Sequence, residues 1–494
     1  MYLATILLCL LAVVGVYFWN NPLHHGGWFL VRRFINWFPL GMSYAFLYMA
    51  RYNINVSKNA LGNMISNEAF GIIFAAGTLV YGFSFLVNGP LVDRLGGKAG
   101  ILIATVGAAV ANVALGLLTW AVLTNRVHVN LIWAFSLLYA LNMYFQSYGA
   151  VSIIKVKAYW FHVRERGVFG AIFGTLISVG IYFAFDWGQA IADQARPTAS
   201  NSNWLHRLIE GVFGMETTGI DAVWAVFFIP AALLIVLAAL DLWLIKDTPE
   251  EAGFASFDTH DASSGKMHVE LTKGDLLRMV FTSPLMWMIA IAEFTSGIFR
   301  NGITQWYFIF AHQVKQIGAE FYFDHWGWLL CVTGIVGGFA AGLVSDKLFQ
   351  SRRGPPVAYL CAIILVAALV MAAVLYSSPV VVGAMGVLIV MCAVGITSLM
   401  SGTAATDFGG RKATATCSGI VDGFAYLGSG LQSVCLGYIT TWNWHWWPLF
   451  LAPFAVVGLF IALRIWNELP AATRRYIAEV ECGETSVSPI AVGK

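Results

Sequence analysis

Two arginines inside long apolar stretches are the residues of this sequence with the most distinctive chemistry. Arg51 lies 17 residues after the expected start of its apolar segment, and Arg300 lies 16 residues after the start of its own. A guanidinium inside a membrane is costly and persists only where it faces a cavity or a partner. Two such groups at similar depth can together grip a tetrahedral phosphate or a planar carboxylate. We therefore expect Arg51 and Arg300 to bind an anionic substrate.

Two carboxylates also lie in apolar segments, and they allow ion pairing or proton transfer beside the arginines. Glu293 precedes Arg300 by seven residues, which is two turns on one helical face, so the two could form a structural ion pair. Arg51 has no acidic residue within two turns, which favours substrate binding over pairing. Asp422 lies in another apolar segment, and carboxylates inside a membrane often relay protons. Glu293 and Asp422 are therefore candidates for proton coupling or for ion pairing.

The composition shows what kind of element must position these residues. Of the 494 residues, 59% are hydrophobic and 11% are charged, and the mean hydropathy is +0.73, far outside the range of soluble domains. Apolar stretches of about 20 residues, the length that crosses a hydrocarbon core, predict transmembrane helices. Alternating strands of the kind that build a β-barrel are not found, so the expected fold is all-α. Twelve predicted helices lie near 34–57, 68–91, 99–120, 131–156, 166–188, 222–246, 284–311, 323–345, 357–377, 379–404, 412–437 and 444–466.

A further apolar segment at 2–18 precedes these twelve. It is short enough to be a secretory signal, but it has no basic residues before it and no small-residue cleavage pattern after it. We interpret it as an extra transmembrane helix.

Several other classes of function are excluded by what the sequence contains. The seven cysteines show no paired metal-ligand spacing, so we expect no disulfide framework, metal site or cofactor. The net charge of +2 includes no basic stripe, which argues against a nucleic-acid partner. No nucleophile, base and orienting group occur together, so an enzyme is not expected.

The distribution of basic residues predicts the orientation in the bilayer. Lys and Arg close to helix ends stay on the cytoplasmic side. If the loop after the second predicted helix is cytoplasmic, that side holds 21 of the 28 basic residues and the opposite side holds five, with Arg51 and Arg300 between them. This bias places the 247–283 linker and the tail inside, and the polar 189–221 loop outside.

Two pairs of similar sequences indicate an internal repeat. Gly89 and Asp93 follow the second predicted helix, and the same spacing recurs after the eighth helix at an offset of 253. Arg51 and Arg300 are related by an offset of 249. Such duplicated halves usually hold the substrate between them near the middle of the membrane. The predicted units are 1–33 (extra helix and connector), 34–246 (first six-helix bundle), 247–283 (linker), 284–466 (second bundle) and 467–494 (cytoplasmic tail).

Charged turns on the cytoplasmic side are candidates for a gate. We expect Gly89 to allow a tight turn, while Asp93 and Arg94 pair with helix ends and neighbouring charges; Asp346 and Lys347 are the equivalents in the second half. The alternative to a gate is a charged turn that is simply solvated and has no role in gating. The run Gly89-x3-Asp93-Arg94-x-Gly96-Gly97-Lys98 resembles the signature loop of the major facilitator superfamily. The segment containing Glu165 and Arg166 looks like the superfamily's second cytoplasmic gate element.

Five stretches resemble the organophosphate:phosphate antiporter family of that superfamily. They are Tyr44-x3-Tyr48-x2-Arg51-x-Asn53, Tyr81-Gly82-Phe83-Ser84, Phe145-Gln146-x2-Gly149, Asp247-Thr248-Pro249 and Tyr426-Leu427-Gly428. Members of the family exchange glycerol phosphate or hexose phosphates for inorganic phosphate, so the resemblance implies that the two arginines bind phosphate. The tyrosines that it places along the pathway are Tyr44, Tyr48, Tyr81 and Tyr426. The sequence departs from the family at Ile177, where a histidine is expected, and at Phe85, where a lysine is common.

The resulting expectation is a secondary transporter of an organic phosphate in the plasma membrane. We expect a monomer with two pseudo-symmetric six-helix bundles that works by rocker-switch alternating access and exchanges its substrate for inorganic phosphate. The apolar replacements at Phe85 and Ile177 admit a more hydrophobic phosphate, phosphonate or carboxylate. Two alternatives remain: a membrane receptor for a phosphorylated metabolite, and a proton-coupled exporter of a more hydrophobic compound.

Overall fold

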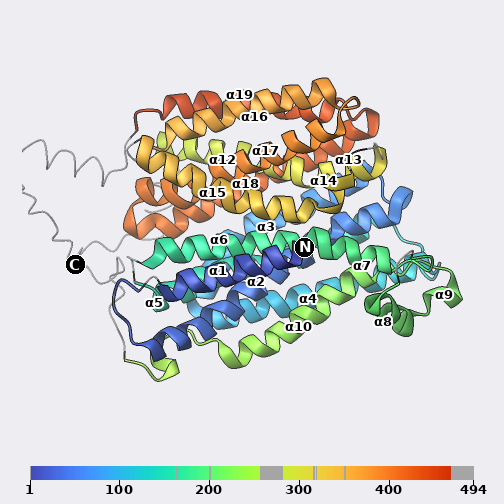
Figure 1. The fold of residues 1–494 in the computed structure, drawn as a ribbon, viewed down its shortest axis with the longest axis horizontal. Helices are drawn as coiled ribbons and strands as arrows, with labels where there is room; N and C mark the ends of the chain where they lie inside the picture. Colours follow the sequence, from blue (N-terminus) through green and yellow to red (C-terminus); the bar gives the residue numbers. More distant parts are fainter. Residues whose placement is uncertain are drawn as a thin grey trace, which may run out of the picture.

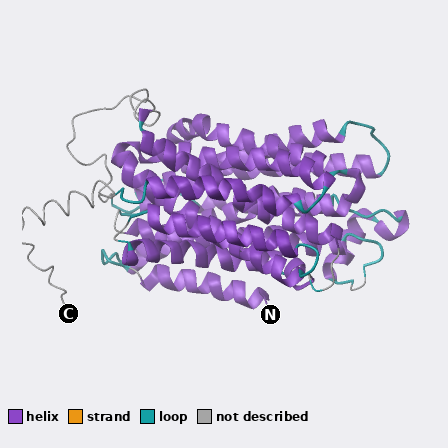
Figure 2. Cartoon of the chain, turned by 90° about the horizontal axis from the view of Figure 1, so that it is seen from above, coloured by secondary structure: helices purple, strands orange, loops and turns teal. Residues whose placement is uncertain are grey.

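The computed structural model describes residues 2–19, 21–162, 165–199, 202–255, 282–314, 318, 320–349 and 352–468. Helices account for the regular structure in these ranges, which confirms the all-α prediction (Figure 2). The long helices lie side by side, with those that precede the 247–283 segment on one side of the molecule and those that follow it on the other (Figure 1). This arrangement places the interface between the halves in the centre.

The helix bounds follow most of the predicted segments. The first half contains α1 (Tyr2–Trp19), α2 (Gly27–Leu61), η1 (Gly62–Met64), α3 (Asn67–Leu95), α4 (Gly97–Leu123), α5 (Leu131–Trp160), α6 (Arg166–Tyr182), η3 (Phe183–Trp187), α7 (Gly188–Gln194), α8 (Trp204–Phe213), α9 (Met215–Thr218), α10 (Ala225–Leu244) and η4 (Glu250–Ala252). The second half contains α12 (Pro284–Thr304), α13 (Trp306–Val314), α14 (Glu320–Asp324), α15 (Trp326–Leu348), α16 (Gly354–Val374), α17 (Pro379–Thr397), η5 (Ser398–Ala404), α18 (Ala405–Trp442) and α19 (Trp446–Arg464).

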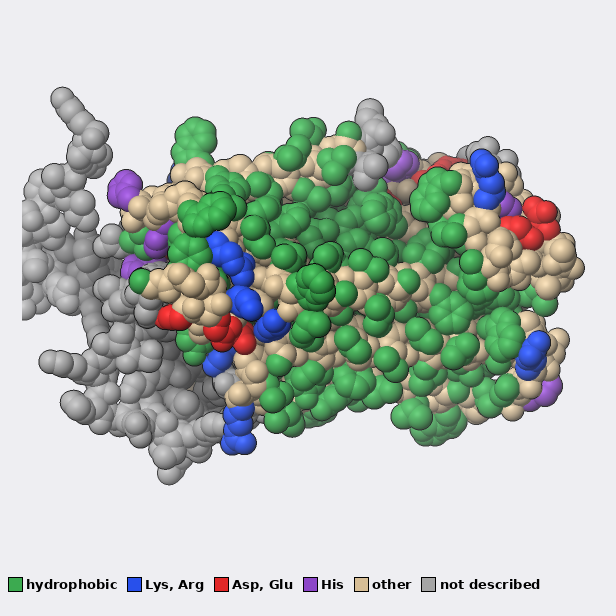
Figure 3. Space-filling view, turned by 90° about the horizontal axis from the view of Figure 1, so that it is seen from below, with side chains coloured by type: hydrophobic (Ala, Val, Ile, Leu, Met, Phe, Trp, Pro, Cys, Tyr) green, Lys and Arg blue, Asp and Glu red, His purple; other side chains and the backbone are tan. Residues whose placement is uncertain are grey.

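The outer surface has the character of a membrane protein. Among the described residues, seven helices are long and apolar enough to cross a bilayer by length and composition. In the face shown in Figure 3, hydrophobic side chains cover the middle of the molecule and charged side chains gather toward its two ends. An apolar band of this kind suits the hydrocarbon core, because exposed charges there are costly.

The second half departs from the predicted helix at 284–311, which the structure divides into α12 and α13. Two buried indoles explain the break. Trp447 Nε1 donates to the carbonyl oxygen of Gly302 at 2.8 Å, and Trp326 Nε1 donates to that of Thr304 at 2.8 Å. Side chains that enter the main-chain hydrogen-bond ladder kink or interrupt a helix. Sequence periodicity cannot detect them, because the tryptophans belong to other helices.

The expected loop at 189–221 also contains helical structure. α8 begins after Asn203, whose Oδ1 accepts the backbone N–H groups of Leu205 at 2.8 Å and His206 at 3.2 Å. An Asn at this position satisfies N–H groups that have no partner within the helix. The predicted connection is therefore a short helical segment at the end of the molecule opposite the basic loops (Figure 1).

The tight turn between α3 and α4 is at Gly96, so its assignment to Gly89 was wrong. α3 continues through Gly89 as a regular helix, whereas Gly96 has a φ of 91° that favours glycine. Asp247 packs against this turn and accepts the backbone N–H of Lys98 at 2.7 Å. A side chain at Gly96 would collide with the Asp247 carboxylate. The first residue of the linker therefore holds the start of α4.

α1 and its connector are anchored to the first half by a buried polar chain. The Tyr17 hydroxyl donates to the Leu30 carbonyl at 2.9 Å and accepts from Arg33 Nε at 2.9 Å. Arg33 in turn donates to both carboxylate oxygens of Glu165, at 2.9 Å each. Arg33 is 1% exposed and Glu165 is 3% exposed. The predicted gate residue Glu165 is thus bound within the first half.

Candidate substrate-binding site

The backbone around Arg51 is fixed by polar side chains from α5. Tyr139 donates its hydroxyl hydrogen to the Arg51 carbonyl at 3.2 Å, and Asn142 Nδ2 donates to the Ala50 carbonyl at 2.9 Å. Asn112 on α4 reaches the same Ala50 carbonyl at 3.3 Å. These interhelical bonds hold the middle of α2 in place, because each one satisfies a group that has no access to water.

The Arg51 guanidinium lies between two aromatic rings and two polar groups. Its Cζ is 4.6 Å from the ring centroid of Tyr48 and 4.4 Å from that of Tyr81. Nε donates to Gln146 Oε1 at 3.0 Å, and Nη1 donates to the Tyr426 hydroxyl at 3.3 Å. Nη2 is buried and has no hydrogen-bond partner among the described residues. The guanidinium is therefore held in position, while its Nη2 is still available to donate to an acceptor.

Arg300 on α12 lies next to the same aromatic groups. Tyr48, Tyr52 and Tyr426 are close enough for their hydroxyls to interact electrostatically with its guanidinium. Nε of Arg300 is buried and has no hydrogen-bond partner in the described parts of the chain. Tyr48 and Tyr426 also neighbour Arg51. The structure thus brings the two sequence-predicted arginines together around shared tyrosines, one from each half.

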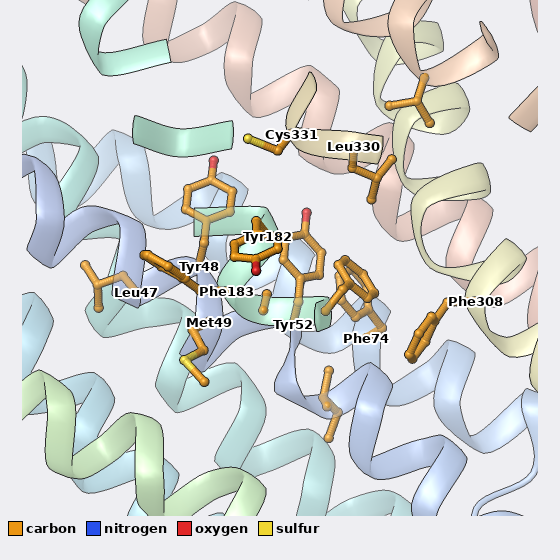
Figure 4. Packing of buried hydrophobic residues seen from close by; sticks show 14 of the residues in the cluster. Leu47, Tyr48, Met49, Tyr52, Phe74, Tyr182, Phe183, Phe308, Leu330 and Cys331 are labelled. Atoms are coloured by element: carbon orange, nitrogen blue, oxygen red, sulfur yellow. The ribbon is translucent and has the colours of Figure 1, made fainter. Parts of the chain in front are cut away.

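The predicted tyrosines converge on this region. Tyr44 and Tyr48 rings are in edge contact at 5.5 Å, and Tyr81 and Tyr426 rings are 4.5 Å apart. Tyr44, Tyr48 and Tyr81 come from the first half and Tyr426 comes from α18 in the second. Figure 4 shows the neighbouring packing, in which Tyr48 and Tyr52 of α2 point toward Leu330 and Cys331 of α15. The tyrosines therefore line the interface between the halves.

Tyr52 and Asn301 were not predicted and connect the two halves directly. The Tyr52 hydroxyl donates to Asn301 Oδ1 at 3.2 Å, and Asn301 Nδ2 donates to Ser429 Oγ at 2.5 Å. Each residue follows one of the two arginines, so the pair has the repeat offset of 249. That offset was a signal from which they could have been found. Gln146, the acceptor for Arg51, lies in a stretch that carried the family resemblance, but sequence gave no reason to pair it with Arg51.

The two candidate carboxylates lie on the Arg300 side of the interface. Glu293 is fully buried, and neither of its oxygens has a hydrogen-bond donor in good geometry among the described residues. Asp422 accepts a short hydrogen bond from the Ser401 hydroxyl. Arg300 interacts electrostatically with both carboxyl groups, and the described contacts include no direct ion pair between Arg300 and Glu293. The two carboxyl groups also lie close enough to repel each other when both are ionised.

Phe85 lies where the family commonly has a lysine. Its ring is 4.8 Å from that of Tyr81 and 6.1 Å from that of Tyr426. Ile177 is a partly buried member of the apolar core. Phe85 therefore extends the aromatic wall next to Arg51 and adds no charge to it.

The predicted gate residues are only partly described. Arg94 and Lys347 are exposed, at the ends of α3 and α15. The side chains of Asp93, Asp346 and Arg166 lie outside the described part of the structure. Of this group, Glu165 has a defined partner, the buried Arg33.

The end opposite the basic loops is closed by contacts between the halves. Asn67 exchanges hydrogen bonds with Gln313 at 2.8 and 3.3 Å and donates to Thr440 at 3.2 Å. Asp186 accepts the backbone N–H groups of Gly327 at 2.7 Å and Trp328 at 3.1 Å, at the start of α15. A carboxylate at a helix N-terminus is favourable, because it satisfies unpaired N–H groups and opposes the helix dipole. The charge bias predicts that this closed end is extracellular.

Comparison with known families agrees with this arrangement of paired helical halves. The sequence pattern of the Major Facilitator Superfamily matches residues 40–433. The chain belongs to this superfamily. Its members are membrane transport proteins, which confirms the expected fold, the membrane location and the absence of an enzymatic role.

Relatives within the superfamily are similar over most of the chain. A glycerol-3-phosphate transporter of Bacillus subtilis (strain 168) is 25% identical over 440 residues, covering 86% of this chain and 90% of the relative. The membrane sensor protein UhpC of Escherichia coli (strain K12) is 23% identical, covering 85% and 88%. A probable hexose phosphate transport protein of Chlamydia pneumoniae is 24% identical, covering 88% and 92%. These relatives confirm the resemblance to the organophosphate:phosphate antiporter family.

A solved structure has the same fold. The bacterial homolog of the human lysosomal transporter Spinster, in an inward-facing and unoccupied conformation, matches with a TM-score of 0.66 at 17% identity. The match covers 91% of this chain and 98% of that one.

Proposed function

We propose that this superfamily member transports an organic phosphate across the plasma membrane by rocker-switch alternating access, in exchange for inorganic phosphate. The observation that carries the proposal is the placement of Arg51 and Arg300. Each half contributes one guanidinium, that of Arg51 buried and that of Arg300 half-buried, and both adjoin Tyr48 and Tyr426. Nη2 of Arg51 and Nε of Arg300 have no partner in the described structure. A phosphate oxygen is a natural acceptor for such donors.

The charge of this site supports exchange of one anion for another. Two guanidinium groups close together repel each other in a low-dielectric interior, and a dianion between them removes that repulsion. Closure around the site is therefore favourable when an anion is present, whether the anion is the organic phosphate or inorganic phosphate. The named relatives include glycerol-3-phosphate and hexose phosphate transporters, which supports this substrate class.

The apolar surroundings narrow the expected substrate. Tyr48 and Tyr81 cover the faces of Arg51, and Phe85 packs beside Tyr81 and Tyr426. A substrate with an apolar part next to its phosphate would bury that part against these rings. We propose that a compact ester with few hydroxyl groups is preferred to a hexose phosphate.

The test is exchange in vesicles that contain the purified protein and are loaded with inorganic phosphate. We expect the native protein to take up labelled glycerol 3-phosphate and Arg51→Lys or Arg300→Lys to take up none. The ammonium of lysine cannot reproduce the planar pair of N–H donors that a guanidinium offers to a phosphate. Arg126→Lys is the matched control, since Arg126 is exposed and lies against Trp120 at the closed end. This control should transport normally.

Two results would contradict the proposal. Normal exchange in Arg51→Lys or Arg300→Lys, with folding verified by melting temperature, would show that the guanidinium groups are not needed. Binding without flux in the native protein would favour a sensor, the role for which the relative UhpC is named.

Proton coupling is a second candidate, supported by Glu293 and Asp422. Glu293, which is buried, and Asp422, which is half-buried, share one nearby cation, Arg300, so keeping one proton between the two carboxyl groups avoids a second unpaired negative charge. We expect Glu293→Gln to abolish uptake driven by a pH gradient while exchange against internal phosphate continues. Gradient-driven uptake that is unchanged in Glu293→Gln, or absent from the native protein, would reject this coupling.

A further inference from the structure

A cavity lined by polar and aromatic side chains lies at the closed, extracellular end of the molecule, between the two halves. Its volume is about 500 Å³. The first half contributes the end of α2 and the start of α3, and the second half contributes the ends of α13, α16 and α18. Besides Lys58, its lining includes Asn67, Gln313, Tyr376, Thr440 and Trp444. This size is within the range of small-molecule sites.

Lys58 is the only charged side chain that lines this cavity in the described structure. It is 3% exposed, and its ammonium donates a single hydrogen bond, to the Gly62 carbonyl at 3.4 Å. No carboxylate of the described residues pairs with it within 4.0 Å. A buried ammonium without a counter-ion is costly, and an anion in the cavity would relieve that cost.

Lys58 also shares a helical face with the central arginine. Arg51, Asn55 and Lys58 stand at positions i, i+4 and i+7 of α2, which places them in line along the helix. The side chain of Asn55 is fully buried, and neither its oxygen nor its nitrogen has a hydrogen-bond partner in the described structure. Buried amides without partners are rare. The three groups cover about 10 Å along the helix axis at 1.5 Å per residue.

The same cavity adjoins the contacts that close this end of the molecule. Asn67, Gln313 and Thr440 line it and also hydrogen-bond to one another across the interface of the halves. An anion at Lys58 can accept hydrogen bonds from the Asn67 and Gln313 amides in place of their bonds to each other. Occupation of the cavity would therefore weaken the closed state of this end.

We propose that this cavity is an outer binding site for a soluble phosphate monoester or inorganic phosphate, with Lys58 as its cation. From there the anion passes Asn55 to reach Arg51. This role rests on the proposed transport of organic phosphate, but it concerns a separate site with separate residues.

The test uses a cysteine in place of Asn63, an exposed residue that lines the cavity. Reconstituted protein is treated from the extracellular side with a membrane-impermeant maleimide, and labelling at position 63 is quantified by mass spectrometry. Glycerol 3-phosphate at about ten times its Kd should slow labelling about tenfold, in proportion to occupancy. The same protection should persist in Asn63→Cys/Arg51→Ala and vanish in Asn63→Cys/Lys58→Gln. Lys58→Arg should restore it.

Each other outcome overturns the outer site. Protection that survives Lys58→Gln shows that the ammonium is not the anion's partner. Protection that Arg51→Ala removes shows that labelling reports only the central site. Protection by phosphatidylglycerol, and none by glycerol 3-phosphate or inorganic phosphate, assigns the cavity to a lipid headgroup. Exchange by the Arg51→Lys variant tests the proposed transport function separately, because that assay does not depend on the labelling at position 63.

Discussion

At the scale of single residues, the described structure explains how a guanidinium is kept in an apolar interior. Arg51 has an aromatic ring on each face, and Gln146 and Tyr426 accept two of its hydrogen bonds. Gln146 is oriented in turn by its bond to Asn142 Oδ1 at 3.0 Å. Each contact limits the rotation of the fork, so its unpaired Nη2 points in a fixed direction. Such preorganisation lowers the entropic cost of gripping an anion.

Gln146→Ala tests this orientation. The change leaves Arg51 Nε without its acceptor, and an unsatisfied buried donor costs about 1–3 kcal/mol. We expect a lower melting temperature and a higher KM for exchange, since the fork is no longer held. Gln189→Ala is the control, because Gln189 bonds to Asp193 near the exposed end of the first half. A native KM in Gln146→Ala would show that the rings alone position the guanidinium.

At the scale of elements, the close crossing of α12 and α18 determines where Arg300 and Tyr426 meet. A Cβ added at Gly297 would collide with the Ala425 carbonyl oxygen, and one added at Gly428 would collide with that of Phe294. Small residues let helices in membranes approach until their backbones touch. Gly297 precedes Arg300 by three residues on α12, and Gly428 follows Tyr426 by two residues on α18, so the tight contact lies within one turn of both side chains.

Gly428→Val should separate the two helices. Overpacking of a tight contact costs about 1–3 kcal/mol, and here it would also shift Tyr426 away from both arginines. We expect a lower melting temperature together with weaker protection by phosphate in a thermal-shift titration. Gly342→Val on α15 is the control, because its added Cβ would meet nothing within 4 Å. Equal effects of the two variants would show that the crossing is not specifically tight.

At the scale of the whole molecule, the described contacts between the halves fit one of the two states that the proposed alternating access requires. Asn67, Gln313 and Thr440 connect the halves at the end predicted to be extracellular, and Asp186 caps α15 across the same interface. Access from outside requires all of these bonds to break together. Aromatic rings also cross this interface, Phe70 with Trp306 at 5.7 Å and Phe185 with Phe308 at 5.1 Å, so the proposed rocking motion would expose apolar as well as polar groups.

A disulfide between Asn67→Cys and Thr440→Cys should lock this state. The two side chains are within 3.2 Å, and they lie on α3 and α18, one from each half. In a background without the seven native cysteines, oxidation should abolish exchange, and a reductant should restore it. Each single variant is a control and should be insensitive to oxidation. Full exchange in the oxidised double variant would rule out opening at this end.

The sequence by itself determined the class of fold, and it identified Arg51 and Arg300 as the candidate anion-binding residues. Hydropathy counts apolar length directly, and an arginine inside such a stretch stands out because charges are excluded from lipid. The repeat offset of 249 also predicted which residues occupy equivalent depths, and Tyr52 and Asn301 meet at that offset. Helix ends were less accurate: the tight turn is at Gly96, and two tryptophan indoles from other helices interrupt the segment expected at 284–311.

Only the tertiary structure decided which partners these residues have. The contact of Arg51 with Gln146 joins positions 95 residues apart, and its contact with Tyr426 joins positions 375 apart. Which faces of α2, α5 and α18 meet depends on helix packing, which single-helix periodicity does not encode. The pairing of Glu165 with Arg33 and the closure at Asn67 arise in the same way. The chemistry of each side chain is local, but its partner is fixed by how the helices cross.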